Sequence, residues 1–151
     1  MTVASDGVWG QIVHNRVILA GFFAWALAQS MKVVLGVVRE RRFNFKWFVG
    51  SGGMPSSHAA TVTAAAVSVG MQEGFYSTVF AVSAVFAFII MFDAQGVRRQ
   101  AGKQAQALND ILDDIYAQRG IKWEPLVELF GHTPIEVFAG AIVGIIVAVT
   151  L

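Results

Sequence analysis

The sequence contains no cysteine, which excludes a disulfide framework, a thiol nucleophile and a cysteine-ligated metal. Charge is also scarce, because only 14% of the 151 residues are charged, whereas a soluble domain usually carries about 25%. Eleven basic and ten acidic residues nearly cancel, and the net charge of +1 argues neither for nor against an acidic partner. We expect no nucleic-acid partner. The length and the absence of internal repeats predict a single domain over residues 1–151.

Apolar residues are abundant, at 56% of the chain, and a water-soluble fold of this length could not easily bury so much apolar surface. A membrane span needs about 20 apolar residues, with about 17 as a lower limit. Asp6 stands where a cleaved signal peptide would have a basic region, so the first apolar stretch is expected to be retained. The sequence predicts an all-α integral membrane bundle with about four transmembrane helices, at residues 17–38, 56–72, 74–92 and 137–151.

The predicted spans differ in composition. The second span is rich in alanine, serine, threonine and glycine, and small residues let helix backbones approach closely in lipid, so it is expected inside the bundle. The third and fourth spans are rich in Phe, Ile and Val and are expected to face lipid. Gly140 and Gly144 form a small-xxx-small pair that indicates a close helix contact in the fourth span.

The connections carry most of the basic charge. Residues 93–118 have good helix formers and predict a cytosolic helical extension of the third span. The first and third connections would lie on one side of the membrane, and they hold nine of the eleven lysines and arginines. The positive-inside rule then places this side in the cytoplasm and both termini on the opposite side.

Lys32 is the only charge within the first predicted span. An ionisable residue inside a membrane is costly and is therefore a functional candidate. Its side chain could instead extend to the membrane interface, which needs no function. Arg39 follows seven residues later, two helical turns on, so both cations share one face of the helix.

A glycine-rich run leads into the second predicted span through Met54-Pro55-Ser56-Ser57-His58. Glycines allow the backbone to approach a ligand closely, and N–H groups at a helix N-terminus bind anions. Ser56 or Ser57 can cap the helix, and His58 would lie in its first turn beside a bound anion. The other interpretation is a capped helix start with an incidental histidine.

The last predicted span is preceded by Gly131-His132-Thr133-Pro134-Ile135-Glu136. Thr133 as N-cap, with proline next and Glu136 three residues after the cap, predicts a capping box. This structural role explains Glu136, but it does not explain His132, which lies just outside the helix and within reach of a carboxylate. A carboxylate partner fixes the tautomer of a histidine and stabilises its imidazolium, which suits a nucleophile or a base.

Two arginines, Arg98 and Arg99, follow the third predicted span. Adjacent helical positions point about 100° apart, so one of the two is expected to face a given ligand. The rigid guanidinium fork suits phosphate oxygens. The pair could instead grip anionic lipids at the membrane surface.

Aspartates form the remaining group of interest. Asp110, Asp113 and Asp114 are typical of a solvated helix face. With Asp93, they could instead bind a divalent cation.

The four-helix topology brings the lysine, both histidines and the arginine pair to one membrane face. With two histidines there and no cysteine, a closed zinc site is disfavoured. Histidines among cations suit phosphoryl transfer, because the cations hold the phosphate, one histidine attacks phosphorus and the other protonates the leaving oxygen. No cofactor is expected.

These residues resemble the motifs of the type-2 phosphatidic-acid phosphatase and vanadium-dependent haloperoxidase superfamily. Lys32-x6-Arg39 matches the first motif without its proline, and Pro55-Ser56-Ser57-His58 matches the second with serine in place of glycine. His132-x3-Glu136 resembles the end of the third motif with glutamate for aspartate, and Leu126 stands where that motif has arginine. Nearly the whole chain is similar to the short, divergent bacterial and plant branch, with the hallmarks Gly53-Met54-Pro55-Ser56-Ser57-His58, Asp93-Ala94-Gln95-Gly96-Val97-Arg98-Arg99 and Gly131-His132-Thr133-Pro134.

The resemblance implies that His132 is a nucleophile that forms a phosphohistidine, that Glu136 orients it, and that His58 is the general acid for the leaving group. It also implies that the phosphate is held by Lys32, Arg39 and Ser57.

We add the hypothesis that Arg98 or Arg99 supplies the missing arginine. It requires a guanidinium within about 6–7 Å of the midpoint between His58 and His132, an arginine reach plus one hydrogen bond.

The leading hypothesis is a membrane phosphatase or phosphotransferase, a phosphoric monoester or diphosphate hydrolase, that acts on a lipid phosphate of the phosphatidate or polyprenyl phosphate type. The alternative is a non-catalytic membrane protein of the same fold that binds anionic lipid or a partner subunit through its basic face. The superfamily's usual core has six helices, so four spans predict a homo-oligomer, most simply a dimer.

Overall fold

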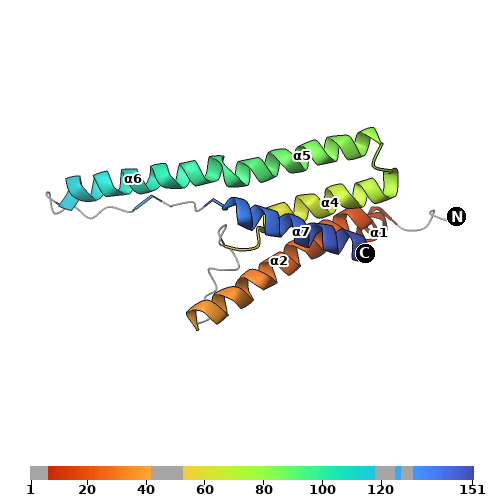
Figure 1. Ribbon diagram of the computed structural model, residues 1–151, viewed down its shortest axis with the longest axis horizontal. Coiled ribbons are helices and arrows are strands. Elements are labelled where there is room, and N and C mark those ends of the chain that lie inside the picture. The colour runs from red at the N-terminus through yellow and green to blue at the C-terminus, as the bar shows by residue number, and fades with distance from the viewer. Residues whose placement is uncertain (1–6, 42–52, 118–124, 127–130) are drawn as a thin grey trace.

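The computed structural model describes residues 7–41, 53–117, 125–126 and 131–151, without the side chains of residues 40, 97–99 and 117. All the regular structure in these residues is α-helical. Four helices pack side by side as a bundle, and a fifth extends beyond it (Figure 1). The bundle comprises α2 (Arg16–Glu40), α4 (Ser57–Glu73), α5 (Thr78–Gln95) and α7 (Pro134–Thr150).

Two helical stretches in the described part of the chain are long and apolar enough to cross a membrane. They are Arg16–Arg39 and Thr78–Tyr116, and Pro134–Thr150 is a shorter apolar helix. Helices α4 and α7 each have 17 residues, which is at the lower limit for a span. The sequence-based prediction of an all-α bundle with apolar helices is therefore confirmed, and the assignment of four spans stays a prediction.

Helix α4 lies at the centre of the bundle and packs against α2, α5 and α7. Its buried residues are all small, namely Ser57, Ala59, Ala60, Ala64, Ala66, Ser68 and Gly70. Alanines from α2, at positions 20, 24 and 28, pack into the same core. Small side chains on both helices let the backbones approach, as predicted for the second span.

Helix α7 packs on α4 through two glycines one helical turn apart. A methyl group built at Gly140 would collide with the carbonyl oxygen of Ser56, and one at Gly144 would collide with that of Ala60. Both collisions involve backbone atoms, which a side-chain rotation cannot relieve. The predicted close contact at the small-xxx-small pair is therefore present, and it holds the first turns of α4 and α7 together.

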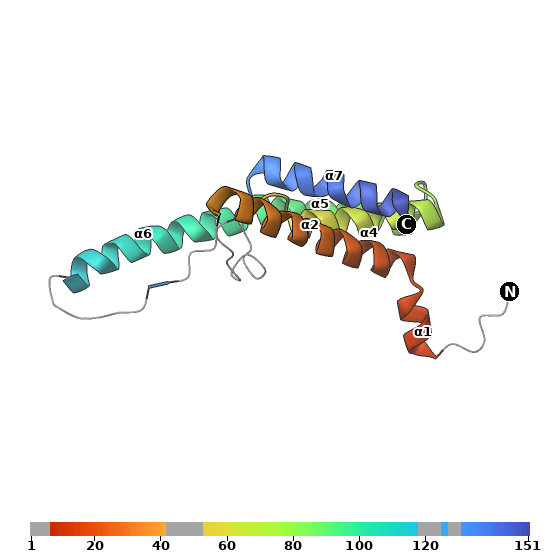
Figure 2. The same cartoon turned by 90° about the horizontal axis from the view of Figure 1, so that it is seen from below.

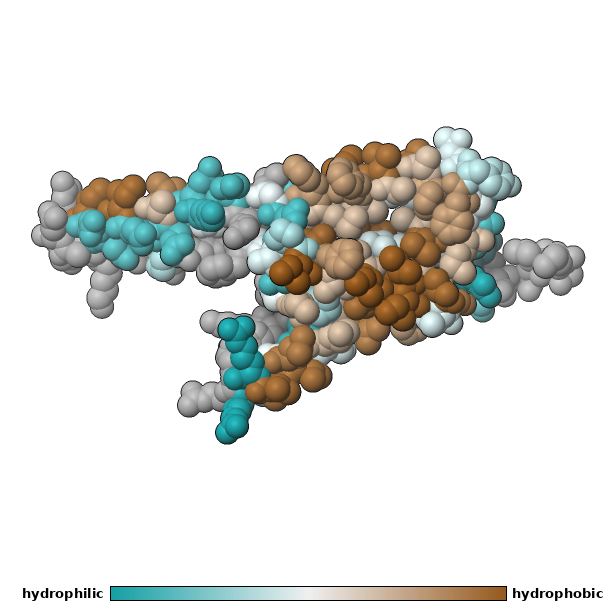
Figure 3. Space-filling view, viewed as in Figure 1, coloured by the Kyte–Doolittle hydropathy of each residue, from teal (hydrophilic) through white to brown (hydrophobic). Residues whose placement is uncertain are grey.

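The outer faces of α5 and α7 are apolar and exposed, as Figure 3 shows over the bundle. On α5 the exposed residues include Val79, Val82, Val85, Phe86, Phe88, Ile89 and Phe92. On α7 they include Ile135, Phe138, Ile142, Ile145, Ile146 and Val149. Large apolar side chains on the outside and alanines on the inside are the distribution that lipid contact favours, in agreement with the expectation for these two spans.

Helix α6 (Val97–Ala117) continues from α5 and projects beyond the bundle (Figures 1 and 2). The predicted extension is thus helical as far as residue 117, but Gly96 interrupts the helix with φ −94° and ψ −72°. Residue 118 lies outside the described residues, and the cytosolic location of the extension stays a prediction. The side chain of Asn109 ties α6 to the returning chain: its Nδ2 donates to the Leu126 carbonyl at 3.0 Å, and its Oδ1 accepts from the Leu126 N–H at 2.9 Å. These bonds hold Leu126, which stands where the third superfamily motif has arginine, alongside α6.

A short helix, α1 (Val8–Val13), precedes the bundle and turns away from α2 (Figure 2). It ends at His14, whose Nδ1 lies 2.7 Å from the carbonyl oxygen of Gly10. Both α1 and the C-terminal Leu151 lie at the end of the bundle opposite the first turns of α4 and α7 (Figure 1). His14 is therefore remote from the other two histidines.

Candidate functional site

Three helix ends meet at one end of the bundle, where α4 and α7 begin and α5 finishes. The N-cap of α4 is joined to α7 because Ser56 N donates to the Glu136 carbonyl at 2.9 Å. The segment before α7 is joined to α5 because His132 N donates to the Ala94 carbonyl at 3.0 Å. These two bonds position the loop residues that precede α4 and α7 against each other.

The two imidazoles lie together at this end. The ring centroids of His58 and His132 are 6.1 Å apart, in an edge-to-face arrangement of 62°. His132 is 1% exposed, and His58, in the first turn of α4, is partly buried. The structure thus brings together two histidines that are 74 positions apart in the sequence, at the spot that the four-helix topology predicted.

Glu136 contacts both the backbone and the imidazole. Its Oε2 accepts from Thr133 N at 3.1 Å, and Glu136 N donates to Thr133 Oγ1 at 3.4 Å, which completes the predicted capping box. The same Oε2 lies 3.0 Å from His132 Nδ1. A carboxylate can only accept at that distance, so the imidazole proton belongs on Nδ1 and the lone pair on Nε2.

Lys32 is contributed to the site by α2. Its ammonium Nζ donates to Ser57 Oγ at 3.4 Å, and the residue is 6% exposed. The group therefore lies inside the bundle, where it also interacts electrostatically with the Glu136 carboxylate. Gly53 passes close by with φ +92°, a conformation that favours glycine. A side chain at this position would be strained beside the lysine stem.

The remaining cations are placed differently. Arg39 lies exposed in the last turn of α2, where the helix diverges from α7 (Figure 1). Arg98 and Arg99 belong to the first turn of α6, but their side chains lie outside the described residues, so the distance condition on their guanidinium groups stays a prediction. The phosphate-binding roles of all three arginines remain predictions.

The aspartates do not form a cluster. Asp110, Asp113 and Asp114 are exposed on α6, and Asp93 lies in the last turn of α5. Asp93 and Asp110 are 17 positions apart, which corresponds to about 25 Å along nearly collinear helices. Within the described ranges, no group of three or more histidines, aspartates and glutamates could hold a metal ion.

Gln29 is a polar residue of the site region that the sequence reasoning missed. It is 6% exposed and precedes Lys32 by three positions, so both side chains share the inner face of α2. A polar residue one turn before a lysine within a predicted span was the signal available in the sequence. The inner face of α2 thus carries two neighbouring buried polar side chains, Gln29 and Lys32.

Three polar groups from different helices therefore lie at this end of the bundle. They are the Lys32 ammonium from α2, the Ser57 hydroxyl from α4 that it contacts, and the Glu136 carboxylate from α7 that contacts His132. The carboxylate is occupied by Thr133 and His132, and the ammonium and hydroxyl can face an anion. A neutral imidazole with its lone pair on Nε2 can act as a nucleophile, and a second imidazole nearby can carry a proton. This set suits displacement at a phosphate.

Comparison with known proteins identifies relatives. Residues 13–147 match the model of a family described as the Divergent PAP2 family. The chain is 40% identical to an uncharacterized membrane protein, YuiD, of Bacillus subtilis (strain 168), over 93% of this chain and 96% of that protein. No solved structure matches the chain.

Proposed function

Because the chain belongs to the Divergent PAP2 family of membrane proteins, we propose that it is a membrane-embedded phosphatase or phosphotransferase that acts on a lipid phosphate through a histidine nucleophile. The substrate class is an amphiphilic phosphate ester, such as phosphatidate or a polyprenyl phosphate. A site at one end of an apolar bundle suits a substrate whose phosphate lies in the interface and whose chain lies in lipid.

One observation carries the proposal. His132 is buried, its Nδ1 is paired with Glu136 Oε2 at 3.0 Å, and a second imidazole lies with its centroid 6.1 Å away. A carboxylate–imidazole pair with the lone pair on Nε2 is the arrangement that activates a histidine for attack. A capping box alone would explain the glutamate, but it would not require an imidazole on the same carboxylate oxygen.

The reaction has two steps. His132 Nε2 forms a bond to phosphorus as the P–O bond to the lipid alcohol breaks, and the alkoxide takes a proton from the His58 imidazolium. Water then attacks the phosphohistidine, gives a proton to His58, and inorganic phosphate leaves as the N–P bond breaks. A second alcohol in place of water would give phosphotransfer. Lys32 stabilises the negative charge on the phosphoryl oxygens, and Glu136 stabilises the imidazolium form of His132.

We further propose that all four bundle helices span the membrane, with the histidine end facing the cytoplasm. The concentration of lysine and arginine in the connections at that end supports this orientation. The dimer expected from the small number of helices remains a prediction, and a monomeric mass in mild detergent would contradict it.

Phosphate release by the purified protein in mixed micelles tests the proposal. His132→Gln should abolish release from phosphatidate and polyprenyl phosphate, and mass spectrometry of the wild type should detect a phosphorylated His132. His14→Gln is the matched control, because His14 lies on α1 at the far end of the bundle. Equal loss in both variants, or unchanged release by His132→Gln, would remove His132 from the mechanism.

The alternative is a non-catalytic protein of the same fold that binds anionic lipid or a partner through its basic face. This alternative predicts that the wild type releases no phosphate and forms no phosphohistidine. Neutralising the basic connection residues, and not His132, would then weaken lipid binding.

A further inference from the structure

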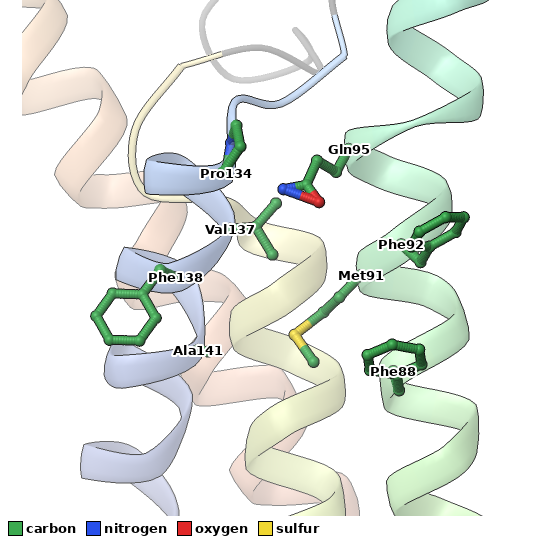
Figure 4. Close-up of a pocket in the computed structure, with 8 residues that line it drawn as sticks. All are labelled: Phe88, Met91, Phe92, Gln95, Pro134, Val137, Phe138 and Ala141. Carbon is green, nitrogen blue, oxygen red and sulfur yellow. The ribbon is translucent and has the colours of Figure 1, made fainter.

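An apolar groove runs between α5 and α7 on the outer face of the bundle (Figure 4). It has a volume of about 290 Å³. This α5–α7 groove is lined by Phe88, Met91, Phe92 and Gln95 from α5 and by Pro134, Val137, Phe138 and Ala141 from α7. Gln95 is the only one of these lining residues with a polar side chain, so the groove suits a hydrocarbon and not a peptide or a sugar.

The groove exists because α5 and α7 each pack on α4 and contact each other far less. Met91 points between the two helices (Figure 4), and its Sδ accepts from Thr63 Oγ1 of α4 at 3.7 Å, so its side chain separates the groove from α4. The mouth of the groove is open, because Phe88, Phe92 and Phe138 on its rims are each more than 60% exposed. A ligand can therefore enter sideways from the face that lipid covers.

One end of the groove lies next to the histidine site. Gln95 follows Ala94, whose carbonyl accepts from His132 N, and Pro134 lies two residues after His132. Figure 4 shows Gln95 directed across this end toward α7. From there the groove runs away from the site over Phe88–Gln95, eight residues that span about 10 Å of helix. Its polar end is thus next to the segment that carries His132, and, if the bundle spans the membrane as proposed, its apolar length leads toward the middle of the bilayer.

We infer that the α5–α7 groove binds the first part of the hydrocarbon chain of the lipid phosphate while its phosphate lies at His58 and His132. This inference rests on the proposed function and adds where the chain lies and which residues select it. Because one end of the groove adjoins the histidine site, we favour the substrate chain as the occupant of the groove over an ordinary bilayer lipid or a helix of a second copy. The groove would thereby place the phosphoester oxygen beside the imidazoles, since this oxygen is joined to the hydrocarbon through glycerol in phosphatidate and directly in a polyprenyl phosphate.

Photolabelling tests the binding directly, without requiring turnover. The full-length protein in lipid nanodiscs is irradiated with a phosphatidate that carries a diazirine near the start of its acyl chain. We expect adducts on the peptides that contain Phe88–Gln95 and Pro134–Ala141, and their loss on addition of unlabelled phosphatidate but not of phosphatidylcholine. Equal competition by phosphatidylcholine, adducts elsewhere, or cross-links to a second copy at the groove would each overturn the inference.

A matched pair of substitutions tests selectivity. Ala141→Phe fills the groove, whereas Ile142→Phe introduces the same ring at the next position of α7, which does not line it. We expect Ala141→Phe to lower kcat/KM for long-chain phosphatidate by about 10-fold or more, with little effect on a short-chain phosphomonoester. Ile142→Phe should change neither. Equal losses on both substrates in Ala141→Phe would overturn the inference.

Different results would refute the proposed hydrolysis and the proposed chain-binding groove. Phosphatidate-specific labelling of the groove without phosphate release would retain the chain site and refute the hydrolysis. Phosphate release that depends on His132, with no labelling of the groove, would retain the hydrolysis and refute the chain site.

Discussion

Glu136→Gln separates the structural from the chemical role of the α7 N-terminus, because one carboxylate oxygen serves both. Oε2 accepts from Thr133 N at 3.1 Å and lies 3.0 Å from His132 Nδ1. Glutamine closes a capping box as well as glutamate does. With its amide oxygen in the place of Oε2, glutamine accepts from both Thr133 N and His132 Nδ1, but the negative charge is lost. The imidazolium form of His132, in which the ring is bonded to phosphorus, then has no carboxylate to stabilise it.

The expected magnitudes follow from these two contacts. Both hydrogen bonds are retained, so the free energy of unfolding should change by less than the roughly 1 kcal/mol that a cap contributes. The charge that stabilises the imidazolium of His132 is lost. Removing one group that stabilises charge in the transition state typically lowers kcat by about 10²–10³-fold, and the rate of phosphate release should fall by about this factor.

The assay pairs phosphate release with thermal unfolding in detergent. Thr133→Ala is the control, because it removes the acceptor of Glu136 N and leaves the pair between His132 and Glu136 intact. This variant should lose about 1 kcal/mol of stability and keep phosphate release within a few-fold of the wild type. Glu136→Gln with nearly unchanged release would show that the carboxylate is a helix cap and nothing more, and the reasoning about the nucleophile would be refuted.

Three further outcomes follow from other parts of the molecule. Lys32→Met should reduce phosphate release by about 10²–10³-fold without lowering the unfolding temperature, because the buried ammonium serves charge stabilisation at a cost in stability. Gly144→Ala should destabilise the protein by about 1–3 kcal/mol in thermal unfolding, since its methyl meets the α4 backbone, whereas Gly7→Ala, with open space around it, should not. Because the chain has no cysteine, Lys103→Cys and Leu151→Cys should react with an impermeant maleimide from opposite sides of the membrane, the first from the cytoplasm.

Helix positions were predictable where apolar length and capping residues agree. The last helix was expected from Thr133, Pro134 and Glu136, and α7 begins at Pro134 with the full capping box. The third predicted span, residues 74–92, began too early, because hydropathy does not register that Ser77 caps α5 and leaves a turn before it. It also ended too early, since α5 runs on to Gln95.

Local breaks and short helices were less accessible to sequence reasoning. Nothing in the composition of residues 93–118 marks Gly96 as an interruption, since a single glycine in a helix costs only about 1 kcal/mol and is often tolerated. Helix α1 has six residues, which are too few for a helical pattern of apolar residues to be recognised in the sequence. Its position outside the bundle is a tertiary arrangement, which local sequence patterns do not predict.

The site shows which inferences spacing alone can support. A spacing of seven positions predicts Lys32 and Arg39 on one helical face, and the family resemblance implies that both hold the phosphate. The structure separates them, because α2 packs on α4 as far as Lys32, which reaches Ser57, and then diverges, which leaves Arg39 exposed. Glu136 is the opposite case: capping was predicted from the sequence and orientation of His132 from the resemblance, and one oxygen makes both contacts. A residue with a complete structural explanation can therefore still belong to the chemistry, which is why the Glu136→Gln experiment must measure stability and phosphate release on the same protein.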